Sequence, residues 1–533
     1  MNIGSAEYTI IGVAPRGFAA TQLVAPPAII PITVSAADGF SEMWQRYRTT
    51  YNMTWLEMFA RRKEGVSFEA MTADLTAAYR RSYENQIALE PRTAPIAVAQ
   101  PRVALYPVFE ERGPSPTADT KVATWLLGVA GVVLLIACAN VGNLLLGRAL
   151  HRRREIGVRI ALGVRRGRLA SQLLIESLML ATLGAVAGLA VAQWGGSVLR
   201  TVLMPQMEWD GTLADGRVLL FAAATALAAG VLAGIAPIVQ SGRTDVSATL
   251  KAGVREGYGQ RSRMRTVLLV MQAALSVVLL VGAGLFVRSL TKVQATDLGY
   301  DPSQLIWVEP RLRGTQLDTT ARRLLRERLI ERARNYPGVE AVSVALTVPF
   351  STTYSDDVFL PGSDSASKLG AFIMQAASPD YFKTLGTRLL HGRAFDAQDR
   401  KGAPLVTIVS KAMAEGLWPG QDAIGKCIKT SADTSPCRTV VGVAENVKFG
   451  GFAEEWNLFT YLAEAQLGPN AYSYFVRASS DARAASEGLR RALQSEMPGT
   501  GYVTARVMSD VVAPAMRSWQ LGATMFAVFG GLA

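Results

Sequence analysis

The sequence predicts an α-helical integral membrane protein that also carries α+β domains on the extracytoplasmic side. Three observations predict this class. Four long stretches contain no charged residue, basic residues gather in two of the loops between them, and the remaining segments show the alternating and helical patterns of ordinary globular domains. The hydrophobic fraction of 50% is close to the globular average, so it is the distribution of apolar residues that decides the class.

Each uncharged stretch is long enough to cross a bilayer, which takes roughly 20 apolar residues. Buried helices of soluble proteins are usually shorter and keep a polar face, whereas these stretches are apolar all round. We therefore expect transmembrane helices in contact with the lipid bilayer. Their expected positions are residues 122–147, 177–199, 218–241 and 266–287, and a further stretch begins in the same way at 518–533.

Charge placement predicts the topology. The net charge is +12, from 55 basic and 43 acidic residues, and most of it lies in segments 148–168 and 241–265. Loops rich in arginine and lysine stay in the cytoplasm, so residues 1–121 and 288–517 are expected on the other side of the membrane. Because topology accounts for the basic charge, nucleic-acid binding is not expected.

Motifs that would indicate catalysis are weak. Two histidines and three cysteines are too few for a zinc cluster or a histidine-based triad, so we expect no catalytic residues, no metal and no cofactor. Residues 420–427 nearly fit a phosphate-binding loop, but Cys427 stands where a hydroxyl must hold Mg²⁺, and a helix and the Trp418-Pro419 turn precede it. We reject a nucleotide site and expect no enzymatic activity from this chain alone.

A repeat divides the extracytoplasmic segments. Residues 9–14 match 439–444, and each copy precedes an amphipathic helix, at 67–83 and 482–494. Residues 7–14 are predicted to form a strand. We infer that residues 1–121 are the C-terminal part of a first domain, that 291–515 form a complete second copy, and that the chain is truncated at both ends.

Within the second copy, the residue pattern predicts both strands and helices. Ser378 and Pro379 have the N-cap and first-turn chemistry to open a short helix that ends at Leu385. Strands are expected at 305–312, 342–346 and 405–409, and longer helices at 319–335 and 411–417.

Two cysteines flank a polar segment between strand-like runs. Cys427 and Cys437 could face each other across a hairpin, and an oxidising compartment would let them form a disulfide. The alternative is two unpaired thiols. Cys138 lies within the first span and is expected to be a free packing residue.

The cytoplasmic segment 152–168 predicts a short amphipathic helix. Ile156, Ile160 and Val164 recur every four residues, with arginines on the other faces. Composition alone favours a simpler interpretation, in which the helix lies on anionic lipid and its arginines set the topology.

Several motifs together resemble those of a known family. Residues 136–146, 154–163 and 172–178 resemble the first span and the cytoplasmic coupling segment of MacB/FtsX-type ABC transporter permeases. Residues 378–386, 391–395 and 417–426 resemble the MacB-like periplasmic core domain. The duplicated layout is similar to that of the acidobacterial duplicated orphan permeases (the ADOP family).

The resemblance implies a domain plan in the inner (plasma) membrane. Residues 1–121 would be the C-terminal part of the first MacB-like domain, and an FtsX-like three-helix permease domain would follow. The FtsX-like domain would cover residues 122–241, a cytoplasmic linker 242–265 and the fourth transmembrane helix 266–290. The second MacB-like domain would cover 291–515, and the truncated start of a second FtsX-like domain 516–533.

The resemblance also implies a mechanism. ATP-driven motion of a separate cytoplasmic ABC ATPase would reach the extracytoplasmic domains and drive efflux or release of a substrate that the sequence does not identify. The two copies would pair as an intramolecular pseudo-dimer. The alternative is a membrane-anchored extracytoplasmic sensor or scaffold that works without an ATPase. The residues expected to contact the ATPase are Glu155, Ile156, Gly157, Arg159, Ile160, Ala161 and Gly163.

Overall fold

The computed structural model divides the chain into two compact units, which are described one at a time. The helix unit comprises Gly12–Pro31, Arg46–Leu290 and Ser518–Ala533, and the domain unit comprises Met1–Ile11, Ile32–Gln45 and Thr291–Arg517. The structure describes residues 2–3, 6–15, 18, 26, 28–32, 51, 58–90, 93, 95–106, 118–151, 164, 166–203, 216–242, 263–312, 315, 317–361, 366–431, 434–452, 457–467 and 473–532.

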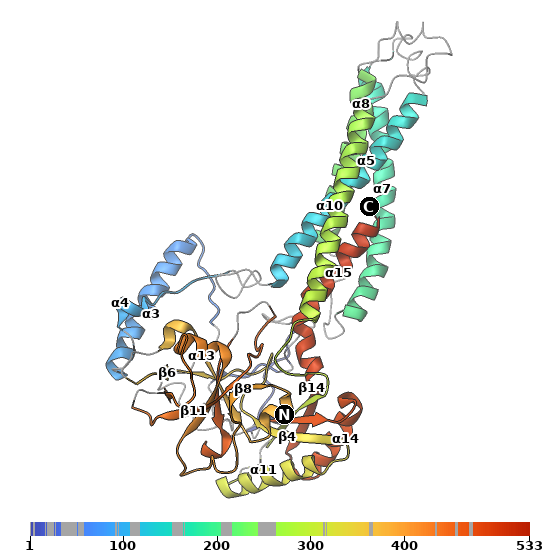
Figure 1. Cartoon of the computed structure of the whole chain (residues 1–533). Coiled ribbons are helices and arrows are strands. Elements are labelled where there is room, and N and C mark those ends of the chain that lie inside the picture. The colour runs from blue at the N-terminus through green and yellow to red at the C-terminus, as the bar shows by residue number, and fades with distance from the viewer. Residues whose placement is uncertain are drawn as a thin grey trace. The chain divides into compact units, whose positions relative to one another are not determined.

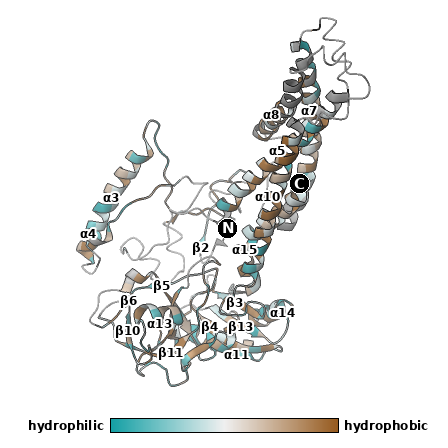
Figure 2. Cartoon of the chain, turned by 45° about the horizontal axis from the view of Figure 1, so that its top comes forward, coloured by the Kyte–Doolittle hydropathy of each residue, from teal (hydrophilic) through white to brown (hydrophobic). Residues whose placement is uncertain are grey.

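Long apolar helices form the core of the helix unit, as predicted. They are α5 (Ala118–His151), α7 (Arg166–Leu203), α8 (Gly216–Gly242), α10 (Arg263–Gln294) and the second half of α15 (Met508–Leu532). They run side by side in Figure 1, and α5 and α10 are predominantly hydrophobic in Figure 2.

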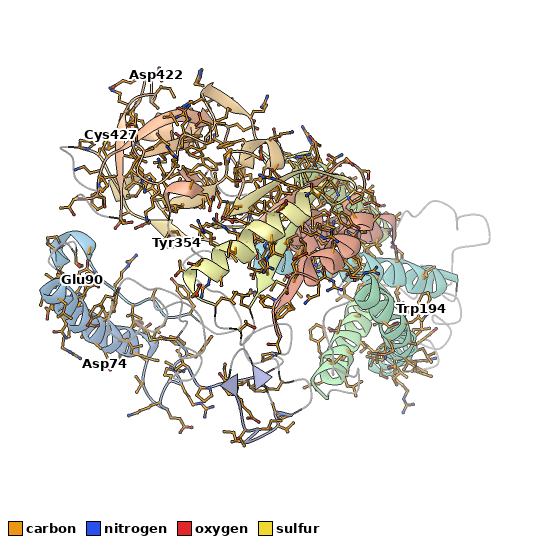
Figure 3. All side chains as sticks on the ribbon, turned by 90° about the horizontal axis from the view of Figure 1, so that it is seen from below. Asp74, Glu90, Trp194, Tyr354, Asp422 and Cys427 are labelled. Carbon is orange, nitrogen blue, oxygen red and sulfur yellow. A yellow bond between two sulfur atoms is a disulfide. The ribbon has the colours of Figure 1, made fainter. Side chains whose placement is uncertain are left out.

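Three stretches of these helices are long and apolar enough to cross a membrane: Lys121–Leu144, Leu174–Ser197 and Thr266–Gln294. In α8, the apolar run among the described residues is the shorter Val218–Val231. Large apolar side chains point outward from the helices, for example Trp194 at 74% exposure (Figure 3). Such surface suits lipid and not water, so the chain is a multi-pass membrane protein.

The helices pack through small residues and through aromatic rings. Gly230 of α8 lies against α7, where an added Cβ would stand 3.0 Å from Leu178 Cδ2. Phe286 of α10 stacks on Phe526 of α15 with ring centroids 4.1 Å apart. A core of Val129, Ile136, Leu279 and Phe526 joins α5, α10 and α15.

The segment before the first span is only partly as predicted. Ser67 caps α3 (Phe68–Leu89), which begins at the expected position, runs past its predicted end and buries none of its residues. The short helix α4 (Ile96–Ala99) follows. The strand predicted at residues 7–14 is wrong, because only Ala6–Glu7 (β2) pairs, with Asn2–Ile3 (β1), and residues 9–15 are exposed without strand structure.

The domain unit contains a four-stranded antiparallel sheet covered by two helices. Side chains of α11 (Thr319–Arg334) and α14 (Ala482–Gln494) share one apolar core with this sheet. The strands, in spatial order, are β14 (Tyr502–Val507), β3 (Leu305–Arg311), β13 (Ser473–Ala478) and β4 (Val339–Ala345).

A second, mixed sheet has eight strands. In spatial order β5, β7, β12, β9, β11, β10 and β6 are hydrogen-bonded neighbours, and β8 pairs with β11. The helix α13 (Lys411–Leu417) packs on one face of this sheet through Met413 and Leu417. The strands are β5 (Ser355–Asp356), β6 (Val358–Phe359), β7 (Phe372–Ala377), β8 (Leu389–Gly392), β9 (Val406–Ser410), β10 (Cys427–Thr430), β11 (Arg438–Ala444) and β12 (Leu458–Ala463).

The largest core lies between the two sheets. Successive side chains of a strand point to opposite faces, so Trp307 of β3 enters this core while Ile306 faces α11 and α14. In the second sheet, Tyr461 of β12 enters the same core while Leu462 faces α13. The domain therefore has the layers helix, sheet, sheet, helix, with α12 (Tyr381–Leu385) packed into the central core.

Local predictions in this domain were mostly confirmed, with two corrections. Helices α13 and α14 match the predicted ranges. Helix α12, however, begins at Tyr381 with Asp380 at the N-cap and no side-chain cap, because the Ser378 hydroxyl instead accepts a hydrogen bond from the Val344 amide. The strand expected at 342–346 is β4, which begins earlier, at Val339, and ends at Ala345, and its Val342 and Val344 share one face, toward the core formed with α11 and α14.

Candidate functional site

The predicted ATPase contact cannot be placed. Glu155, Ile156, Gly157, Arg159, Ile160, Ala161 and Gly163 all lie outside the described residues. What the structure defines are the two flanking helices, because α5 ends at His151 and α7 begins at Arg166. Helices α10 and α15 both continue into the domain unit, which contains residues 291–294 and 508–517 of these helices.

Both connecting segments enter the central core of the domain unit. Leu298 and Tyr300, just after α10, and Met508 and Val512, at the start of α15, are all at most 7% exposed and belong to the core between the two sheets. We call this region the helix–domain junction, defined by residues 297–303, 384–388, 445–449, 477 and 508–512. Burial of these side chains fixes both connections to the domain.

The turn after α10 is closed by hydrogen bonds on several sides. Asp297 Oδ1 accepts from the Gly299 amide at 2.9 Å, and the Gly299 carbonyl accepts from Thr387 Oγ1 at 2.7 Å. The Leu298 carbonyl accepts from the Lys448 amide at 3.0 Å. Gly299 has φ +74°, and a Cβ there would lie 2.1 Å from the Asn446 carbonyl oxygen, so only glycine fits.

Asp301 continues the junction. Its amide donates to the Leu385 carbonyl at 3.0 Å, and its Oδ1 accepts from the amide and hydroxyl of Ser303 at 3.0 and 2.6 Å. Burial acts to raise the pKa of Asp301, but the Ser303 hydrogen bonds and the positive charge of Arg477 outweigh it, so that this pKa lies below its usual value. The side chain is therefore a carboxylate at neutral pH.

Arg477 of β13 connects the four-stranded sheet to α12 and to the turn after α10 across the junction. Its Nε donates to the Thr384 carbonyl at 2.8 Å, and its Nη1 donates to Gln304 Oε1 at 3.1 Å and lies 3.5 Å from Asp301 Oδ2. The side chain is only 10% exposed. Gly386 makes room for it, because a Cβ at that position would stand 2.7 Å from Nη2.

The start of α15 is held in the same way. The Ser509 amide donates to the Pro302 carbonyl at 3.2 Å, and Asp510 forms an ion pair with Arg483 of α14. That pair is half-exposed, so we attribute the fixed position mainly to burial of Met508 and Val512.

The segment that resembles the family at 391–395 has a local structural role. Gly392 has φ +77° and contacts the backbone of β11 so closely that a Cβ would lie 2.2 Å from the Val441 carbonyl oxygen. Arg393 then holds the buried Asp399 with two hydrogen bonds of 2.7 and 2.9 Å. These hydrogen bonds lower the pKa of Asp399, although burial opposes them.

The two cysteines of the polar hairpin lie together. Cys427 pairs with Thr439 in the antiparallel β10–β11 ladder, and Cys437 directly precedes β11, with the two Cα atoms 5.6 Å apart (Figure 3 labels Cys427). This spacing is typical of bonded cysteines. Cys138 is partly buried in α5.

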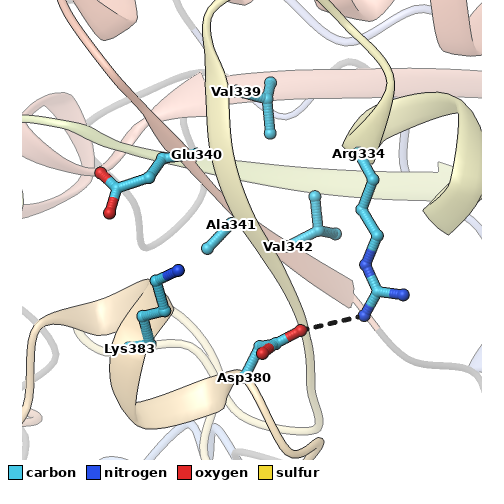
Figure 4. A pocket seen from close by; sticks show the side chains of 7 residues that line it. All are labelled: Arg334, Val339, Glu340, Ala341, Val342, Asp380 and Lys383. Carbon is cyan, nitrogen blue, oxygen red and sulfur yellow. Dashed lines mark hydrogen bonds and ion pairs between the residues drawn. The ribbon is translucent and has the colours of Figure 1, made fainter.

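One pocket of about 260 Å³ opens on the surface of the domain unit. Its floor is formed by β4, and Arg334 pairs with Asp380 at 3.1 Å on its wall (Figure 4). Lys383 and Glu340 complete the charged lining. Two cations and two carboxylates balance, so the pocket has no net charge that would favour a charged ligand.

Sequence reasoning did not single out Gly299, Asn446 or Arg477. A signal existed for Arg477, because one arginine interrupts the otherwise apolar strand Ser473–Ala478, and a charge in such a strand needs buried partners. Asn446 and Gly299 meet only through the tertiary fold, and no local pattern marks them.

Comparison with known proteins agrees with this architecture. Residues 127–246 match the family model of the FtsX-like permease C-terminal domain, and residues 265–492 match that of the MacB-like periplasmic core domain. By these two domains the chain is of the MacB/FtsX permease type. The ATPase parts of the matched proteins are not covered by this chain.

Curated relatives match over limited regions. The uncharacterized ABC transporter permease YknZ of Bacillus subtilis (strain 168) is 34% identical over 84 residues, which are 16% of this chain and 21% of YknZ. The macrolide export ATP-binding/permease protein MacB of Hyphomonas neptunium is 35% identical over 134 residues, or 24% of this chain and 19% of that protein. The chain thus spans about a fifth of the length of these relatives.

Among solved structures, the periplasmic region of MacB from Actinobacillus actinomycetemcomitans is 14% identical with a TM-score of 0.31, covering 42% of this chain and 97% of that one. The extracellular domain of YknZ from Gram-positive bacteria is 15% identical with a TM-score of 0.27, covering 38% and 99%. Because both TM-scores are below 0.5, the domain assignment rests on the two family models.

Proposed function

We propose that this chain is the membrane permease subunit of an ABC transporter. A separate cytoplasmic ATPase would supply the energy, and the extracytoplasmic domain would use the transmitted motion for efflux or release of a substrate. The observation that carries the proposal is the helix–domain junction, because both helix connections are buried in the domain core. A soft linker could not pass on a helix displacement, whereas a packed core can.

The proposed ATPase contact is the segment from Glu155 to Gly163. Glu155 and Arg159 are four residues apart, so on a helix they would share one face and present a fixed charge pattern. Ile156 and Ile160 would supply the apolar part of the contact. The Hyphomonas relative is named as an ATP-binding/permease protein, and this supports an association of this type of membrane domain with an ATP-binding domain.

We further propose the domain plan of a duplicated permease. Residues 1–121 would belong to a first MacB-like domain and 291–515 would be the second, and the two copies would pair within one polypeptide. The repeated motif at 9–14 and 439–444, each followed by a capped helix, supports this arrangement.

The direct test is a pull-down from native membranes with an antibody against residues 292–515, read by mass spectrometry. We expect an ABC ATPase to copurify with the unchanged protein, and to be lost from Arg159→Glu and from the Ile156→Asp/Ile160→Asp double variant at equal membrane levels. Arg255→Glu, in the other basic cytoplasmic segment, is the matched control and should retain the ATPase.

The outcomes separate the hypotheses. Recovery of the ATPase with every variant would support the permease and refute the coupling segment. Recovery of this chain without any ATPase, together with unchanged function when cellular ABC ATPases are disabled, would favour a membrane-anchored sensor or scaffold.

A further inference from the structure

The turn after α10 contacts a segment that also binds α13. Residues 445–449, which we call the strap, lie between β11 and β12 and touch the turn at two points. The Lys448 amide donates to the Leu298 carbonyl at 3.0 Å, and the Asn446 carbonyl stands where a Cβ of Gly299 would be. Gly299 is itself buried, so the turn cannot move toward the strap without displacing it.

Asn446 contacts a second element through its side chain. Its Oδ1 accepts a 2.7 Å hydrogen bond from the amide of Ala412, in the first turn of α13. The backbone of Asn446 thus lies against Gly299, in the turn that follows α10, while its side chain accepts a hydrogen bond from α13. The strap is also fixed at its start, where Glu445 accepts from the amide and guanidinium of Arg388 at 2.6 and 2.8 Å.

The N-terminus of α13 depends on this contact. The first amides of a helix lack partners within the helix and must find them elsewhere. Ser410 Oγ accepts from Met413, and Asn446 Oδ1 accepts from Ala412. Because α13 has only seven residues, two side-chain caps are a large part of what keeps it helical.

Helix α13 in turn covers the outer face of the eight-stranded sheet. Met413 is fully buried there, and the Thr460 hydroxyl of β12 lies 3.3 Å from its sulfur. Leu417 and Trp418 complete the contact. A shift at the N-terminus of α13 therefore acts on the face that is opposite to the central core.

We propose that Asn446 is a positioning residue that transmits displacement of the turn after α10, at Gly299, to α13, so that the outer face of the eight-stranded sheet follows this turn. The purpose of this coupling rests on the proposed function, but the coupling itself requires no ATPase and no substrate. It identifies which part of the domain responds when this turn is displaced.

The experiment is hydrogen exchange by mass spectrometry on the full chain in lipid nanodiscs, reading peptides that cover residues 411–417. Gly299→Ala forces the turn against the strap, and we expect it to raise exchange in α13 about tenfold. Asn446→Ala removes one cap and should raise exchange about fivefold by itself. Because the path is then broken, adding Gly299→Ala to Asn446→Ala should produce no further increase.

Two variants keep the test decisive. Asn446→Asp preserves an acceptor oxygen at the helix N-terminus, and it should restore both normal exchange and the response to Gly299→Ala. Asp297→Ala removes the acceptor of the Gly299 amide and a carboxylate that acts on Arg388, so it supplies a milder perturbation of the turn if Gly299→Ala does not fold. We expect Asp297→Ala alone to raise hydrogen exchange in α13, and we expect no further increase when Asp297→Ala is added to Asn446→Ala.

Asp318→Ala is the matched control, because it removes the side-chain cap of α11 on the other sheet. It should raise exchange in α11 and leave α13 unchanged. The proposal is overturned if the turn variants leave α13 unaffected, or if they raise its exchange equally with and without Asn446. Either result leaves the ATPase pull-down untouched, so the two proposals fail independently.

Discussion

Arg477 of β13 donates a 2.8 Å hydrogen bond from Nε to the carbonyl oxygen of Thr384, 93 residues earlier in the chain. This contact joins the four-stranded sheet to α12, which packs in the core shared with the second sheet. A charged side chain that is almost wholly buried therefore helps to hold α12 in this core.

Arg477→Met should destabilise the domain substantially. The substitution leaves the buried Thr384 carbonyl without this donor, which typically costs about 1–3 kcal/mol, whereas the pair with Asp301 adds little because Asp301 is 44% exposed. We expect a lower thermal unfolding temperature for the purified chain. Arg491→Met is the matched control, since Arg491 is 72% exposed in a surface pair with Glu487, and it should change little. Equal losses in the two variants would contradict a special role for Arg477.

Acid should weaken the domain partly through Asp399. The pKa of this carboxyl is lowered from 3.8 in the folded protein, chiefly by its hydrogen bonds with Arg393. A lowered folded pKa means that the unfolded chain binds protons first. The stabilisation is therefore complete above about pH 4 and is lost as the pH falls through the lower folded value.

The check is a series of unfolding temperatures between pH 7 and pH 3. Asp399→Asn should unfold several degrees lower at pH 7, and its unfolding temperature should fall less on acidification than that of the unchanged protein. Parallel curves for the two proteins would show that Asp399 does not contribute to the acid sensitivity.

Local patterns predicted elements well where local chemistry decides them. Helix α14 was expected as an amphipathic helix and has the expected bounds, and in the structure Asp481 caps it while Leu489 and Leu493 are buried. The strand expected at 7–14 fails for a physical reason. Its counterpart at 439–444 is a strand because β8, β9 and β10 pair with it, whereas no described strand pairs with residues 9–14.

The functional geometry was harder to predict. The strand β4 is buried on both faces, because α11, α12 and β7 all contact it, whereas the residue pattern predicted only the face formed by Val342 and Val344. The contact between Gly299 and Asn446 joins segments about 150 residues apart, and no single-sequence pattern encodes that distance. The segment around Arg159 was proposed from a sequence resemblance alone, and it lies outside the residues that the structure describes.

The hairpin cysteines give a chemical prediction. We propose that Cys427 and Cys437 form a disulfide in an oxidising compartment, which restricts a loop with a sequence separation of 10. Neither should react with a maleimide unless the protein is first reduced. Replacing both with Ala should lower stability by up to about 3 kcal/mol through the less restricted unfolded chain. Labelling of either cysteine without reduction would refute the bond.

Two glycines in the membrane helices differ in their packing and can be compared by the same substitution. Gly230 of α8 lies against α7, with Leu178 Cδ2 and Ala181 Cβ at 3.0 and 3.2 Å from an added Cβ. Gly184 of α7 has nothing within 4 Å of the same position. A side chain at Gly230 must therefore push the two helices apart, whereas one at Gly184 extends into open space.

Gly230→Leu should weaken the packing of α7 on α8 by about 1–3 kcal/mol, the usual cost of overfilling a packed contact. Gly184→Leu should have little effect, because glycine and leucine differ there only in helix propensity, which favours leucine. The measurement is the temperature at which each variant loses its folded, monodisperse form in mild detergent. If Gly184→Leu is the more damaging of the two, then α7 uses that face for a contact that the packing of α7 and α8 does not explain.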